Sequence, residues 1–182
     1  MPPKGISPQK WGRVTWVMLH GLAHLAIARP QPHGARAVRH IVKECMPALL
    51  PCRKCRKNLK KKLAKLPEPD ARSVERDPRL LAVWVHELHN LTNVATGKPR
   101  VAFADGLDGK LAALSVQRLW HTVHVATRHA ARYIARCLEE RKENAKRSQS
   151  AADEYVEAAQ RYHEFRLLVA VVLGLPEKIG RA

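Results

Sequence analysis

The hydrophobic positions along most of the chain recur three and four residues apart, the spacing that gathers side chains on one face of an α-helix. The first such series follows Ser7 and Pro8, which suit a helix start, and consists of Val14, Met18, Leu22 and Leu25. The RPQPHG stretch at 29–34 breaks this helix. The alternation of Val, Ile and Thr that is typical of strands does not occur in the sequence. The pattern therefore predicts an all-α fold.

A second and a third helix are predicted on either side of Pro51. The second has one apolar face, made of Val38, Ile41, Val42, Cys45 and Leu49. Pro51 ends this helix and starts the third, whose apolar face is Cys52, Cys55, Leu59, Leu63 and Leu66. Cys52 and Cys55 are thus expected in the first turn of the third helix, on its apolar side.

The remaining elements divide the chain in two. A fourth helix is expected from Asp77 and Pro78, a cap and first-turn pair, to a stop at Gly97. Loops are expected over 66–76 and 98–109, and long helices over 110–146 and 151–173. We therefore predict a helical bundle over 8–109 and a C-terminal helical extension over 110–182.

The composition agrees with a helical and basic molecule. With 182 residues, 46% of them hydrophobic, the chain can bury a core. A formal net charge of +17 draws it toward polyanions and acidic protein surfaces, so non-specific nucleic-acid binding stands beside a merely solvated basic surface. The N-terminal segment has no apolar signal core, and the longest apolar run, 167–175, is too short to span a bilayer. We expect a soluble protein with no membrane partner, and the sequence indicates no compartment.

The CxxC motif at Cys52 and Cys55 is open to two chemical interpretations. Zinc requires four ligands, but a second CxxC is missing, and His86 and His89 lie too far along the chain for a finger. A redox pair fits better, because a helix N-terminus and neighbouring cations stabilise thiolates and should depress a cysteine pKa. A solvated basic helix with two incidental cysteines is the alternative; it does not explain why both sulfurs share the apolar face.

Two polar stripes follow the predicted helices. The fourth helix has one at helical spacing: His86, His89, Asn90 and Asn93. The first helix has residues four apart: Gly12, Trp16, His20 and His24. A buried polar group without a partner costs about 1 to 3 kcal/mol, so we expect a heteroatom-rich ligand between these helices. Ordinary core packing is the alternative for the first helix.

Three segments of the sequence resemble the Erv/ALR family of FAD-linked sulfhydryl oxidases. GRVTWVMLH at 12–20 resembles the family's GRxTWxxLH helix, and PCRKC at 51–55 resembles its PCxxC. WVHELHNLTNVATGKP at 84–99 resembles its WxCxxHNxVNxxLGKP. The three occur in the family's order and cover roughly residues 8 to 103.

The resemblance implies a four-helix bundle around FAD, a short fifth helix and a homodimer. It makes Cys55 the sulfur beside the flavin and Cys52 the one that exchanges with substrate. Its FAD-binding residues would be Gly12, Arg13, Trp16, His20, Trp84, His86, His89, Asn90, Asn93 and Lys98. It implies no metal.

The sequence departs from the family at a structural disulfide. Its first cysteine, two residues after the tryptophan, is His86 here, and the position of its partner falls among Val101, Ala102 and Phe103. Neither tail has a second CxxC or CxC to act as a shuttle. Forms without that disulfide and with added C-terminal sequence resemble those of large DNA viruses, which implies host cytoplasm or nucleus and the virion as locations.

The sequence thus predicts an FAD-dependent thiol oxidase that forms disulfides in protein substrates through Cys52 and Cys55 and reduces O₂ to H₂O₂. The alternative is a basic helical protein without turnover that binds nucleic acid or builds a virion. Intact Cys52 and Cys55 favour the enzyme, whereas the charge and the basic extension favour the alternative.

Overall fold

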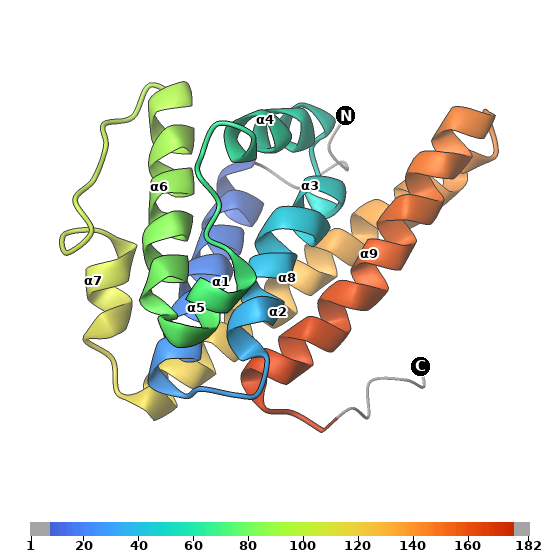
Figure 1. Ribbon diagram of the computed structural model, residues 1–182. Helices are drawn as coiled ribbons and strands as arrows, with labels where there is room; N and C mark the ends of the chain where they lie inside the picture. The colour runs from blue at the N-terminus through green and yellow to red at the C-terminus, as the bar shows by residue number, and fades with distance from the viewer. Residues whose placement is uncertain (1–7, 177–182) are drawn as a thin grey trace.

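The computed structural model describes residues 8–176, and every regular element within that range is a helix (Figure 1). The predicted all-α fold is confirmed. The elements are α1 (Pro8–Ala28), α2 (Gly34–His40), η1 (Ile41–Cys45), α3 (Met46–Leu49), α4 (Arg53–Leu63), α5 (Ala71–Arg76), α6 (Arg79–Ala95), α7 (Leu107–Ala112), α8 (Val116–Ala145) and α9 (Gln149–Leu173). The predicted cap at Ser7 lies outside the described residues.

The first helix lies in the middle of the molecule. It packs against α2, α6, α7 and α8, and residues 18–26 are buried without interruption. A helix covered on several sides must be apolar around much of its circumference, which explains why His20 and His24 need partners inside the protein.

The second predicted helix has the expected extent but not a uniform geometry. It is continuous through α2, η1 and α3, and η1 is a π-helical segment in which Met46 N–H donates to the carbonyl of Ile41. Pro47 follows directly; it has no N–H, and its ring crowds the carbonyl four residues earlier. The α-helical bond pattern therefore cannot pass unchanged through this turn.

Two short helices correct the predicted loops. The prediction of a loop over 66–76 is wrong at α5, which Asp70 caps by accepting hydrogen bonds from Arg72 N–H and Ser73 N–H at 2.9 and 3.0 Å. The predicted helix over 110–146 is also divided. Its beginning belongs to α7, and α8 starts anew after Ser115, whose hydroxyl accepts from Arg118 N–H at 3.4 Å.

The C-terminal helices α8 and α9 form an antiparallel pair that shares the core of the bundle. Tyr162 Oη donates to the carbonyl of Ala131, and Trp120 Nε1 donates to that of Leu173, which fixes the register. One hydrophobic cluster joins both predicted segments; from the extension it includes Leu119, Val123, Ile134 and Phe165. The prediction that 8–109 is a separate unit stays a prediction.

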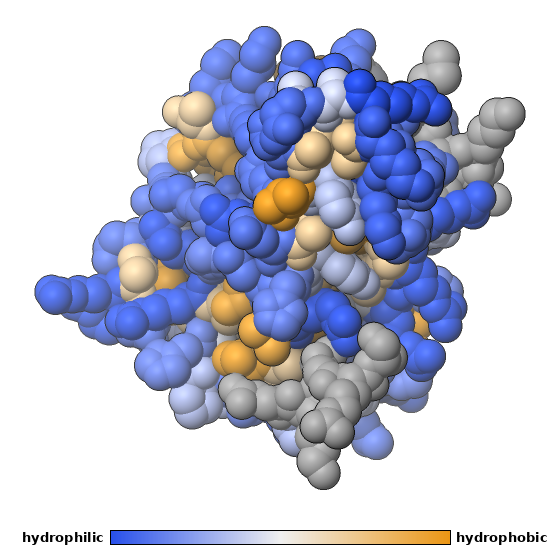
Figure 2. All heavy atoms as spheres, turned by 90° about the vertical axis from the view of Figure 1, so that its right-hand side faces the viewer, coloured by the Kyte–Doolittle hydropathy of each residue, from blue (hydrophilic) through white to orange (hydrophobic). Residues whose placement is uncertain are grey.

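The surface around α8 and α9 is mostly hydrophilic, with small apolar areas (Figure 2). Among the described helices, none combines the length and the apolar character needed to cross a membrane.

Candidate functional site

A cavity of about 230 Å³ lies between α1, α3, α4 and α6. Its lining is mostly apolar and includes Trp11, Gly12 and Trp16 from α1 and Cys55 from α4. A Cβ added to Gly12 would meet no atom within 4 Å, so the wall is open at this point. The Trp11 indole N–H is buried and has no hydrogen-bond partner among the described residues. The cavity therefore offers an apolar space lined by two indole rings and the sulfur-bearing residue Cys55.

The two cysteines differ in their relation to this cavity. Cys52 is the N-cap of α4, and its sulfur accepts a hydrogen bond from Cys55 N–H at 3.3 Å. Both side chains are half-buried, but only Cys55 lines the cavity. The predicted placement in the first turn of a helix is confirmed for Cys55, while Cys52 stands one position before that helix.

The expected depression of a cysteine pKa is wrong for Cys55. Burial, followed by the hydrogen bond with Cys52, raises the pKa of the Cys55 thiol to about 12, although Lys62 and Arg56 act in the opposite direction. Lys62 also lines the cavity, and burial lowers the pKa of its ammonium group. The prediction from the sequence considered only the cations directly beside the motif. It missed Lys62, which lies two helical turns after Cys55 on the same face of α4.

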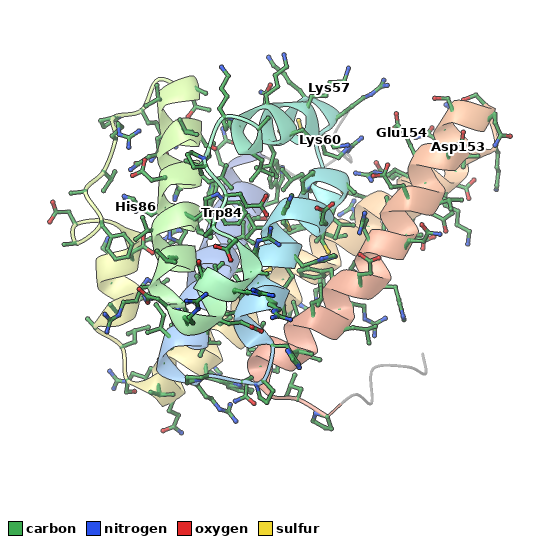
Figure 3. All side chains as sticks on the ribbon, viewed as in Figure 1. Lys57, Lys60, Trp84, His86, Asp153 and Glu154 are labelled. Carbon is green, nitrogen blue, oxygen red and sulfur yellow. The ribbon has the colours of Figure 1, made fainter. Side chains whose placement is uncertain are left out.

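The C-terminal helices hold the segment that precedes Cys52. Arg141 of α8 donates to the carbonyls of Ala48 and Leu50 at 2.8 and 3.0 Å. Arg56 donates to the same Leu50 carbonyl at 3.0 Å, and Glu154 of α9 pairs with Arg56 at 3.6 Å. Figure 3 shows Glu154 on α9 opposite the lysines of α4. These long-range contacts have no sequence signal, because periodicity does not relate residues so far apart in the chain.

A buried carboxylate occupies the space between α1, α6 and α7. Asp108 is fully buried, and three histidine nitrogens lie within hydrogen-bond distance of it: His20 Nδ1 at 2.8 Å, His24 Nε2 at 3.0 Å and His86 Nδ1 at 2.8 Å. A carboxylate can only accept, so each of these nitrogens donates. Burial alone raises the pKa of the Asp108 carboxyl, but the histidine hydrogen bonds outweigh it and hold the pKa well below its usual range.

This carboxylate also sets the proton positions on the next histidine. Since His20 Nδ1–H donates to Asp108, its Nε2 is free to accept from His89 Nδ1, 3.0 Å away. Burial, and then the proximity of the His20 and His86 rings, lowers the pKa of His89 to about 4, so this ring is neutral near pH 7. The His89 ring stacks on Trp16 with 4.1 Å between ring centroids and 7° between planes. The carboxylate thus orients the ring that supports a wall of the cavity.

The loop after α6 is tied down by polar contacts at the position of the family's structural disulfide. His86 Nε2 lies 3.0 Å from the Val101 carbonyl. Asn90 Oδ1 accepts from Val101 N–H at 3.0 Å, and Asn90 Nδ2 donates to the Val101 carbonyl at 3.0 Å. Farther along, Gly109 packs so close to the Ala104 carbonyl that a Cβ there would collide with it. We call the contacts of His86 and Asn90 with Val101 and Asp108 the loop clamp.

The predicted FAD-binding residues fall into distinct groups. Gly12 and Trp16 line the cavity. His20, His86 and His89 belong, with His24 and Asp108, to a group that we call the histidine cluster. Asn90 belongs with His86 to the loop clamp. In Figure 3, His86 lies on the side of α6 that faces α7, and Trp84 on the opposite side. Trp84 contributes to a different hollow, with residues of η1, α4 and α9.

Arg13 and Lys98 are exposed, and Asn93 is half-buried near the end of α6. The roles of these residues toward FAD stay predictions.

The expectation that the polar stripes of α1 and α6 need a ligand as their partner is wrong in part. The polar stripes were expected to lack partners inside the protein, yet Asp108 satisfies His20, His24 and His86, and Val101 satisfies Asn90. Sequence reasoning missed Asp108 because a single acidic residue in a loop has no periodic signature. The excess of histidines on neighbouring helices was the one available signal.

Comparisons with known proteins place the bundle in one family. Searches of curated proteins and of solved structures returned no significant match. The model of the Erv1/Alr family, however, matches residues 13–110, more than half of the chain. That range contains the CxxC pair, the histidine cluster and the lining of the cavity except Trp11 and Gly12. On this match the chain belongs to the Erv1/Alr family.

Proposed function

We propose that this protein oxidises thiols of protein substrates to disulfides at the Cys52–Cys55 pair, with FAD as cofactor and O₂ as electron acceptor. Family membership implies FAD-linked sulfhydryl oxidase activity. The observation that carries the finer assignment is the placement of the two sulfurs. Cys55 lines the cavity, whereas Cys52 is outside it, next to Cys55 at the start of α4.

The residues of the cavity fit a flavin ring. The mostly apolar lining of the space includes Trp11 and Trp16, and the wall is open above Gly12. An apolar, aromatic lining suits an aromatic ring. We infer that Gly12, Trp16 and Cys55 surround the flavin ring, and that the exposed cations Arg13 and Lys98 serve the phosphates outside the cavity.

The chain's own part in the reaction is a thiol–disulfide exchange. A substrate thiolate attacks Cys52 of the Cys52–Cys55 disulfide, which breaks that bond, forms a mixed disulfide and releases Cys55 as the leaving group. A second substrate thiolate then attacks the substrate sulfur of the mixed disulfide and releases Cys52. The substrate leaves as a disulfide, and its two electrons remain on the Cys52–Cys55 pair as two thiolates, which can take up protons from solvent.

Lys62 and Arg56 make Cys55 a better leaving group. Burial disfavours the Cys55 thiolate, and the two cations oppose that effect. FAD, when bound, supplies the two-electron chemistry that returns the pair to the disulfide and reduces O₂ to H₂O₂.

A zinc site at the CxxC motif finds no support among residues 8–176. In this range no third His, Cys, Asp or Glu side chain lies close enough to Cys52 and Cys55 to form a three-ligand group with them. Because zinc needs four ligands and at least three from the protein in most sites, the pair fits redox chemistry better.

The test combines flavin content with turnover. We expect yellow protein with one FAD per chain, and H₂O₂ production from dithiothreitol that Cys52→Ser and Cys55→Ser each abolish while FAD stays bound. Cys137→Ser is the matched control, since this buried cysteine lies outside the cavity and should leave turnover unchanged. Turnover that survives in either active-site variant would refute the assignment.

A second variant tests where the flavin binds. Gly12→Val projects a side chain into open space, so the fold should persist. If the ring occupies the cavity, this variant should fold without flavin; a Gly12→Val protein with full flavin content would place the cofactor elsewhere.

A further inference from the structure

A second cluster of ligand-type side chains lies away from the redox pair, where the π-helical segment meets α9. We propose that His40, Cys45 and Glu164 form a three-ligand site for a zinc ion that fastens α9 to the helix preceding the redox motif. Their ligand atoms all lie within 4.8 Å of one another. The three residues come from two elements that pack together, η1 with its flanking residue and α9.

The spacing of two of these ligands already suits one zinc ion. His40 Nε2 lies 3.3 Å from Glu164 Oε2. Two ligands at about 2.05 Å from zinc in tetrahedral geometry are about 3.3 Å apart. The sulfur of Cys45 needs only to move closer to complete the third position.

The π-helix explains how His40 and Cys45 come to share one face. In an α-helix, residues five apart point about 140° away from each other. In η1 the bond from Met46 N–H to the Ile41 carbonyl closes a turn of five residues, which brings residues five apart to the same side. Such segments are frequent at functional sites, and this one places an imidazole and a thiol together against Glu164.

The charges and exposure of the cluster also suit zinc. A thiolate and a carboxylate balance a divalent cation, and a neutral imidazole adds no charge. Cys45 is fully buried, whereas the side chains of His40 and Glu164 are each 41% exposed. The exposed side leaves room for a water molecule as fourth ligand.

The neighbouring groups set two conditions for binding. Burial, and then the charge of Glu164, raise the pKa of the Cys45 thiol to about 12, so the cation must displace a proton. Arg161 donates to Glu164 Oε2 at 2.8 Å and lies 3.8 Å from Glu44. It can therefore turn from Glu164 to Glu44 when the carboxylate binds zinc.

Cobalt titration of the full chain tests the site, because a Co²⁺ ion bound by a thiolate gives a charge-transfer band in the near ultraviolet. The titration uses the Cys52→Ser/Cys55→Ser protein, in which the redox pair cannot bind metal. We expect one Co²⁺ per chain with this band, displacement by Zn²⁺, and a higher melting temperature with either ion.

Two variants and a control decide the outcome. His40→Gln, at a half-exposed position that should fold normally, is expected to weaken Co²⁺ binding by at least about 100-fold. Cys45→Ser should remove the charge-transfer band. His163→Gln, an exposed histidine beside Glu164, is the control and should bind as the parent does. Absence of the band up to millimolar Co²⁺, or binding that His40→Gln leaves unchanged, would overturn the proposal.

Discussion

Replacing Asp108 by asparagine should destabilise the protein strongly, although the side chain keeps its shape. The carboxylate accepts from His20 and His24 through Oδ1 and from His86 through Oδ2. An amide retains one accepting oxygen, which can serve His20 and His24, but its NH₂ group then faces a donor of His86. His86 can adapt only by moving its proton to Nε2, which places that proton against the NH₂ group of Asn90, a donor 3.0 Å away, and so disturbs the loop clamp.

The size of this effect follows from the bonds that change. Two hydrogen bonds lose their charge-assisted character, at about 1 kcal/mol each, and one is lost outright, at about 1 to 1.5 kcal/mol. The total of about 3 kcal/mol corresponds to a fall in melting temperature of about 6 to 12 °C for a domain of this length.

The assay is thermal unfolding at pH 7 followed by circular dichroism, with Asp105→Asn as the control. Asp105 lies three residues earlier, in the loop before α7, and is exposed, so its replacement should change the melting temperature by no more than about 1 °C. An Asp108→Asn protein that melts within the same margin of the wild type would show that the carboxylate does not organise the histidines.

The same pair of proteins gives a pH dependence. The pKa of Asp108 is depressed in the folded state, so its stabilisation is present above the unfolded-state pKa of about 3.9 and is lost as pH falls below it. The difference in free energy of unfolding between wild type and Asp108→Asn should stay near its full value at pH 5 and shrink toward pH 3. A difference that grows on acidification would contradict the assigned protonation state.

Three further predictions concern packing, the redox segment and disulfides. Gly21→Ala should cost about 1 to 3 kcal/mol in denaturant unfolding, because the added methyl collides with the stiff Val123 side chain, and Val123→Ala in the same protein should restore stability. Arg141→Met should slow dithiol oxidation, because two hydrogen bonds that hold the chain before Cys52 are lost. Arg141→Lys, which keeps the charge but not the two guanidinium donors, should be nearly as slow. Wild-type rates in both variants would show that Arg141 does not position the redox pair. Mild reductant should leave the melting temperature nearly unchanged, because the remaining cysteines Cys45 and Cys137 are buried free thiols; a large drop would reveal a structural disulfide.

The sequence was sufficient to predict the long helices and the redox motif. Helical spacing of apolar residues identified α1, α4, α6 and α9, because each packs apolar side chains three and four residues apart against the bundle. It failed where a local group or a proline decides the geometry. Asp70 creates α5 within a Pro-rich segment through two hydrogen bonds, and Pro47 forces the preceding turn out of α-helical geometry.

The candidate site was predictable only where its parts lie close together in the sequence. Cys52, Cys55, Gly12 and Trp16 come from short motifs, and three of them line the cavity. Asp108 and Arg141 were missed because each acts on residues that are distant in the chain. Only the packing of α7 and α8 against α1 and the redox segment brings these charges to the site.

The histidine cluster changes how the loop after α6 is secured. The family resemblance implies a disulfide between the position of His86 and the chain near Val101. Here Asn90 connects these two positions, because its amide contacts His86 Nε2 and holds Val101 through two hydrogen bonds, and Asp108 anchors the histidine from the other side. A disulfide near the site of thiol exchange is itself open to attack by substrate thiols. Hydrogen bonds to a buried carboxylate are indifferent to thiols and are weakened by acid instead. The attachment of this loop therefore depends on the protonation state of Asp108 and its histidines. Among residues 8–176, Cys52 and Cys55 are then the pair through which a change in thiol redox state acts on the site.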